Sequence, residues 1–138
     1  MKKDIRFFKK LLVTSLILTL ICGCVRIKEA SRIILGTSVS SLEKARINGK
    51  TQTFNYDYEK CYKKVLLILR QMNVYIYLHS LKERRIVAMN FEGANKTTEV
   101  GIFFEEITPS STKVEISCLA PSVLENVSEK IFIALKGK

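Results

Sequence analysis

The sequence predicts an α+β fold, a two-layer sandwich in which a four-stranded antiparallel sheet carries two helices on one face, in the order β-α-β-β-β-α. Two stretches have apolar residues at three- and four-residue spacing, which is typical of helices buried on one side. Between these stretches, apolar and polar residues alternate, as in strands of a sheet with one buried face. We expect this domain over residues 51–138.

The composition bounds the class of protein. The chain has 138 residues, a formal net charge of +10, 47% hydrophobic and 26% charged residues. These values fit one globular domain with a targeting segment, and they exclude a disordered chain and a multi-span membrane protein. One His and four Cys leave little material for a metal site, so we expect neither a metal nor a cofactor.

The first strand and helix have clear signals. Thr51–Tyr56 has strand composition, and Asp57 is a suitable N-cap for a helix over Tyr58–Met72. Asn73 is expected to end this helix. Its buried stripe consists of Tyr58, Cys61, Val65, Ile68, Leu69 and Met72, and its basic, solvated face carries Lys60, Lys63, Lys64, Arg70 and Gln71.

Four runs with strand character follow the helix, and we expect a meander of three strands there, giving a four-stranded sheet. The runs are Val74–His79, Ile86–Phe91, Thr97–Ile107 and Thr112–Ala120. Strict alternation predicts that Tyr75, Tyr77 and His79 share one face of the first run.

A closing helix is expected after Pro121. Ser122 and Glu125 fit a capping box at its start. Its buried stripe is Val123, Leu124, Val127, Ile131, Ala134 and Leu135.

The N-terminus has the features of an export signal. A basic start precedes the uncharged run Leu11–Cys22, which would span about 18 Å as a helix, too short for the hydrocarbon core of a membrane. Leu20-Ile21-Cys22-Gly23-Cys24 resembles the bacterial lipobox, in which the leader is cut before a lipidated Cys. The resemblance implies a signal peptide over residues 1–23 and an acyl anchor on Cys24, which would tether the protein to a lipid membrane. The alternatives are an ordinary cleaved signal with two incidental cysteines, or an uncleaved anchor.

Residues 24–50 are expected to form a lipidated tether with short helices, one of them over Leu42–Ile47. The first part lies either on anionic lipid or in solvent, and the sequence leaves both open. Val25 after the lipidated residue implies, by the sorting rule of such lipoproteins, the outer membrane facing the periplasm.

Few residues have catalytic potential. His79 is the only histidine, and no nucleophile or orienting acid is marked beside it, so we expect no enzyme activity. Cys61 and Cys118 both fall on predicted buried faces, and they are either a disulfide or two buried free thiols.

A partner surface is the stronger candidate. Tyr75, Tyr77 and His79 lie next to a charged turn, and the surface would comprise these three residues with Lys82, Arg84 and Arg85. Basic and aromatic residues also interleave in binders of single-stranded nucleic acid, but export argues against a nucleic-acid partner. The basic residues then form either a solvated face or a surface attracted to an anionic membrane or envelope polymer.

The chain from about residue 50 to 135 resembles small uncharacterised bacterial lipoproteins with one β-α-β-β-β-α domain. The matching stretches are Phe54–Tyr58, Cys61-Tyr62, Ile68-Leu69, Val74–Tyr77, Arg85–Ala88, Thr97–Phe104 and Thr112–Ile116. More distantly it resembles the domains of the outer-membrane assembly lipoprotein BamC, although Cys61-Tyr62 stands where those domains often have Trp and Asn73 where they often have Gly. The resemblance implies a fold more than a role.

We therefore expect a membrane-anchored envelope lipoprotein that acts as a non-catalytic binding or assembly-accessory module with an envelope protein as partner. The alternative is binding of a lipid or an apolar small molecule between the sheet and the helix over 58–72.

Overall fold

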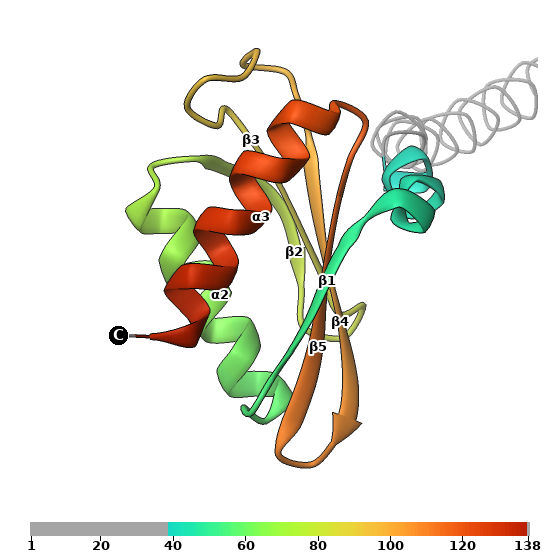
Figure 1. Cartoon of the computed structure of the whole chain (residues 1–138), viewed down its shortest axis with the longest axis vertical. Helices are drawn as coiled ribbons and strands as arrows, with labels where there is room; N and C mark the ends of the chain where they lie inside the picture. The colour runs from blue at the N-terminus through green and yellow to red at the C-terminus, as the bar shows by residue number, and fades with distance from the viewer. Residues whose placement is uncertain (1–38, 138) are drawn as a thin grey trace, which may run out of the picture. The chain divides into compact units, whose positions relative to one another are not determined.

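The computed structural model describes residues 39–137, in which an open antiparallel sheet is covered by helices (Figure 1). The strands are β1 (Lys50–Phe54), β2 (Tyr75–Ser80), β3 (Arg85–Met89), β4 (Val100–Thr108) and β5 (Ser111–Cys118). Their spatial order is β1-β5-β4-β3-β2, so β1 and β2 are the two edges.

The α+β class is confirmed, but the expected strand count is wrong, because the sheet has five strands and not four. Each of the four runs after the first helix forms its own strand. Residues 90–99 separate β3 from β4, and the turn at Pro109-Ser110 separates β4 from β5, so neither pair of runs merges into one strand.

Helix α2 (Tyr58–Gln71) begins and ends where its sequence predicts, within one residue. The Asp57 side chain accepts a hydrogen bond from the Lys60 backbone N–H at 2.9 Å, which satisfies one of the free donors at the helix start. After Met72, Asn73 has φ +54°, a left-handed conformation that stops the helix.

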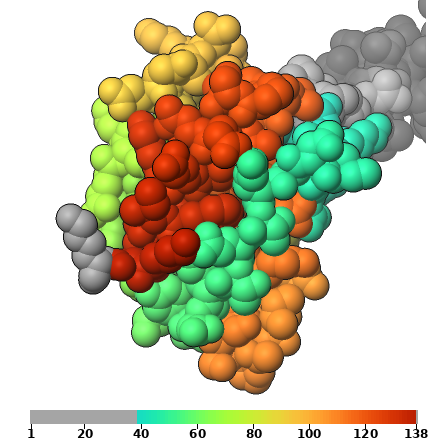
Figure 2. All heavy atoms as spheres, viewed as in Figure 1, coloured from blue at the N-terminus to red at the C-terminus, as the bar shows by residue number. Residues whose placement is uncertain are grey.

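Helix α3 (Pro121–Lys136) begins one residue before the predicted capping box. Pro121 occupies the first turn, where its missing N–H costs no hydrogen bond, and Ala120 is the N-cap without a side-chain bond. The prediction that Ser122 caps this helix is therefore wrong. In Figure 2 the atoms of α3 lie directly against those of β1.

One core joins α2 and α3 to the same face of the sheet. Tyr58, Tyr62 and Phe104 form an aromatic cluster in it, with ring centroids 5.2–6.1 Å apart. Its fully buried members are Cys61, Val65, Leu69, Ile86, Ala88, Val100, Ile102, Val114, Ile116, Ile131 and Leu135.

A third helical segment, residues 39–48, lies on the opposite face, which we call the open face. It consists of a helix over residues 39–45 and a 3-10 turn, η1 (Arg46–Asn48). These residues, expected as a short helix within the tether, belong to the same compact unit as the sheet.

Candidate functional site

The predicted partner surface is divided between the two faces of the sheet. A β-bulge between Ile76 and Leu78 shifts the register of β2 against β3. Tyr75 pairs with Met89 and faces the open side, whereas His79 pairs with Ile86, a core residue on the helix side. The prediction that Tyr75, Tyr77 and His79 share a face is therefore wrong, because the extra residue of a bulge inverts the alternation beyond it.

Two neighbouring side chains of β2 point to the open face as a result. Tyr77 and Leu78 both pack against the small apolar cluster of that face, and Tyr75 is 61% exposed at the same edge. The two tyrosines thus lie on the open face, as alternation predicts, and the bulge adds Leu78 to this face and moves His79 to the other, at an outer strand of the sheet.

His79 has an aromatic neighbour on the helix side. Its Nδ1 lies 3.5 Å from the hydroxyl of Tyr62, whose pKa is raised by burial. A phenol with a raised pKa stays protonated near neutral pH, so it lacks the negative charge with which a carboxylate orients a catalytic histidine. This pair has the character of a structural contact between α2 and β2.

Two of the three cations predicted for the partner surface at the charged turn form ion pairs with nearby carboxylates. Arg84 lies 3.5 Å from Glu106 and stacks on the Tyr58 ring at 5.1 Å, both on the helix side. Lys82 is exposed and has no carboxylate of residues 39–137 within 4.0 Å. The predicted cluster of Lys82, Arg84 and Arg85 thus contains one cation without an ion pair.

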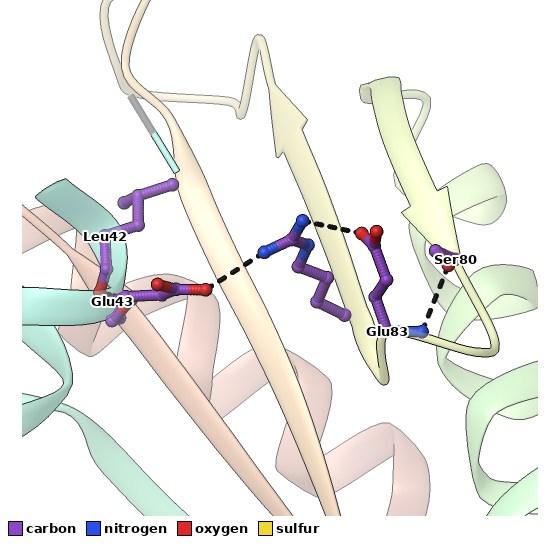
Figure 3. Close-up of polar contacts among 6 residues, drawn as sticks. Leu42, Glu43, Ser80 and Glu83 are labelled. Carbon is purple, nitrogen blue, oxygen red and sulfur yellow. Dashed lines mark hydrogen bonds and ion pairs between the residues drawn. The ribbon is translucent and has the colours of Figure 1, made fainter. Parts of the chain in front are cut away.

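Arg85 instead joins the turn to the 39–48 segment on the open face. Its guanidinium donates to Glu43 at 3.0 Å and to Glu83 at 2.6 Å. Figure 3 shows the Glu43 and Glu83 carboxylates approaching this group from two sides. The Ser80 hydroxyl oxygen accepts a hydrogen bond from the backbone N–H of Glu83. The Nε of Arg85 is buried and has no hydrogen-bond partner among residues 39–137.

The rest of the 39–48 segment is attached just as closely. Leu42 is buried on Val87 and Phe103, and its backbone carbonyl accepts a buried hydrogen bond from the Ser117 hydroxyl at 2.8 Å. Arg46 forms two hydrogen bonds to the Glu115 carboxylate at 2.9 and 3.0 Å, which raises the arginine pKa. It also lies 4.7 Å from the centroid of the Phe103 ring.

Sequence reasoning missed these contacts. Glu43, Arg46, Ser117 and Glu115 are far apart in the chain, and no local pattern connects them. The spacing of Val39, Leu42 and Arg46 at three and four residues was the available signal, since it places them on one helix face.

Cys61 and Cys118 are free, buried thiols, so the structure has no bridge between them. Cys61 lies in the first turn of α2. This end of the helix is close to Thr112 of β5, because the Thr112 hydroxyl donates a hydrogen bond to the Tyr56 carbonyl just before the helix. Cys118 is six residues further along β5, about 20 Å at the rise of a strand, and a disulfide needs Cα atoms within about 7 Å. Burial raises the Cys61 pKa to about 11 and also raises that of Cys118, so both thiols remain protonated.

No known protein-family model and no curated protein matches the chain. The resemblance to small lipoproteins and to BamC therefore stays a prediction. Cys24, the proposed lipid site, lies outside the described residues.

The layer between α2 and the sheet is filled by side chains. Val65 and Leu69 of α2 and Ile102 and Val114 of the sheet have no exposed surface. Two hollows on the described surface lie elsewhere, one of 440 Å³ along the outer face of α2 and one of 500 Å³ between the 39–48 segment and the start of α3.

Two further observations concern the part of the chain that the structure describes. No three His, Cys, Asp or Glu side chains there lie close enough to hold a metal ion. None of its helices has the length and apolar character required to cross a membrane.

Proposed function

We propose that the protein is a lipid-anchored, non-catalytic binding module of the bacterial envelope, and that a protein partner binds at the edge formed by β2. Support for the anchor comes from the sequence. The basic start, the short uncharged run and Leu20–Cys24 together have the order of a lipoprotein leader.

The observation that carries the binding role is the position of the tyrosines. β2 is an outer strand, so no strand of residues 39–137 pairs with its outer backbone groups. Tyr75 is largely exposed on the open face of this edge, and Leu81 next to the strand is also exposed. An extended partner segment could pair with the strand while its side chains contact the tyrosine.

Binding of a lipid or an apolar small molecule between α2 and the sheet remains the alternative. Such a site needs a cavity of several hundred Å³. The filled layer around Val65 and Leu69 counts against it.

A photo-crosslinking residue at position 75 tests the binding role. Ile133 on α3 is the matched control, because it is 62% exposed and Tyr75 is 61% exposed. We expect a discrete protein adduct in living bacteria from position 75 and none from position 133. Absence of an adduct at position 75, or the same adducts from both positions, would contradict the proposal.

A further inference from the structure

The outer face of α2 combines positive charge with an exposed leucine. Lys60, Lys63, Lys64 and Arg70 lie on the side of the helix turned away from the core, and Leu67 between them is 55% exposed. Residues at these spacings follow one line along the helix, which is about 21 Å long. We call these five residues the α2 stripe.

Three of its four cations lack a carboxylate partner among residues 39–137. Lys63 is bound to Glu59 at 2.6 Å. Lys60 and Lys64 lie instead over the Tyr56 ring, with Nζ 5.6 and 4.5 Å from its centroid, and Arg70 is exposed without an ion pair.

Other cations of the domain are differently placed. Lys113 forms an ion pair with Glu105, and Lys50, Arg46 and Arg85 each lie within 3.0 Å of a carboxylate. The α2 stripe is thus a local excess of positive charge on a domain whose other basic side chains are often paired. An excess of this kind is complementary to a surface of negative charge.

The exposed leucine indicates which negative surface fits. Helices that lie in the interface of a membrane combine Lys and Arg, which meet anionic headgroups, with apolar side chains that enter the headgroup region. Leu67 stands in the middle of the basic side chains, where it would enter that region as they bind phosphates.

Because the proposed anchor already holds the protein at the membrane, a weak contact between the α2 stripe and lipid is sufficient for docking. Fourteen residues lie between Cys24 and Val39, and a chain of that length reaches about 50 Å when extended. A tether of this reach permits either side of the domain to face the membrane and keeps the domain at high local concentration.

We propose that the α2 stripe docks on anionic phospholipid and so leaves the opposite face of the sheet turned toward the periplasm. This inference rests on the anchor of the proposed function. In this orientation the open face and Tyr75 are available to a protein partner.

Fluorescence quenching in vesicles tests the docking. The mature acylated protein is reconstituted through its own anchor, with a dye on Leu67→Cys or, as control, on Ile133→Cys. Cys61 and Cys118 are buried and remain unlabelled in the folded protein. The lipid carries a headgroup-level quencher and is either pure phosphatidylcholine or contains about 30% phosphatidylglycerol.

We expect several-fold stronger quenching at position 67 in the anionic vesicles, no such difference at position 133, and loss of the effect at high salt. The triple variant K60Q/K64Q/R70Q should abolish it, whereas K44Q/K96Q/K130Q, which removes the same net charge elsewhere on the domain, should retain it. Equal quenching at position 67 in both lipids, or equal losses from both triples, would overturn the inference, as would an acidic protein that binds the stripe while lipid does not.

Flotation separates this inference from the anchor. A protein that floats with phosphatidylcholine vesicles but shows no lipid-dependent quenching retains its anchor and lacks docking. A protein that does not float lacks the anchor, and the inference falls with it.

Discussion

Cys61 and Cys118 show that the sequence pattern predicts the burial of a cysteine better than its pairing. Their positions on predicted apolar stripes favoured burial, and both are buried in the core between the helices and the sheet. The choice between thiol and disulfide depended on which ends of α2 and β5 meet, and that is a property of topology and not of spacing.

The raised pKa of Cys61 gives a prediction on stability. Its pKa is about 11 in the folded protein and about 9 in the unfolded chain, so folding favours the protonated thiol. This contribution is complete below about pH 9 and is lost as the pH rises through about 11.

Urea unfolding of the wild type and of Cys61→Ala, measured with reductant between pH 7 and pH 10, isolates this effect. We expect the free energy of unfolding of the wild type to fall relative to the variant by an amount on the order of 1 kcal/mol near pH 10. A constant difference across this range would mean that Cys61 ionises as readily in the folded protein as in the unfolded one.

At the scale of elements, periodicity predicted most of the fold. α2, β5 and α3 lie where apolar spacing placed them, because each buries one face against the same core. The bulge in β2 was not predictable, since neither Gly nor Pro marks it, and it alone moves His79 to the other side. The expected common face of Tyr75, Tyr77 and His79 is therefore wrong, and the role of this surface in binding a partner stays a prediction.

The 39–48 segment is the other element that local patterns described incompletely. Its helix was expected, but its place on the open face comes from contacts with Val87, Phe103, Ser117 and Glu115, which only the folded sheet brings together. The segment is held as part of the domain, and its removal would expose Phe103 and leave the Arg85 guanidinium with one carboxylate.

Leu42→Ala measures how much the segment contributes. Leu42 is 1% exposed, and we expect its truncation to lower the free energy of unfolding by about 2–4 kcal/mol. Lys44→Ala, on the exposed side of the same helix, should change it by less than about 0.5 kcal/mol.

Chemical denaturation followed by circular dichroism gives both values. A change in Leu42→Ala as small as that in Lys44→Ala would mean that the segment is a loose tether whose detachment leaves the domain equally stable.

At the scale of the whole molecule, the +10 charge has two different parts. Five basic residues and one acidic residue lie in the first ten positions, where positive charge would orient the proposed leader on the cytoplasmic side. In the described domain, Arg46, Arg84 and Arg85 are in ion pairs, and three of the cations without an ion pair lie close together on α2. A net charge summed over the chain therefore gives no support to a nucleic-acid partner.

The proposed anchor depends on one sulfur atom, and Cys22 and Cys24 provide a matched test of it. A lipid thioether needs the thiol of the residue that becomes the mature N-terminus, so Cys24→Ala should abolish palmitate labelling, leave the leader uncut and reduce the tightly bound membrane fraction. Cys22 leaves with the leader, so Cys22→Ala should be labelled, cut and fractionated like the wild type. Labelling, gel mobility and carbonate extraction of membranes measure the three effects.

The pattern of failures would distinguish the remaining explanations. If both variants are cut and released, the segment is an ordinary cleaved signal with incidental cysteines. If neither the variants nor the wild type is cut and all stay in the membrane, the uncharged run is an uncleaved anchor. Only loss of labelling in Cys24→Ala with retention in Cys22→Ala assigns the lipid to Cys24, because the two residues share the same side chain and lie two positions apart.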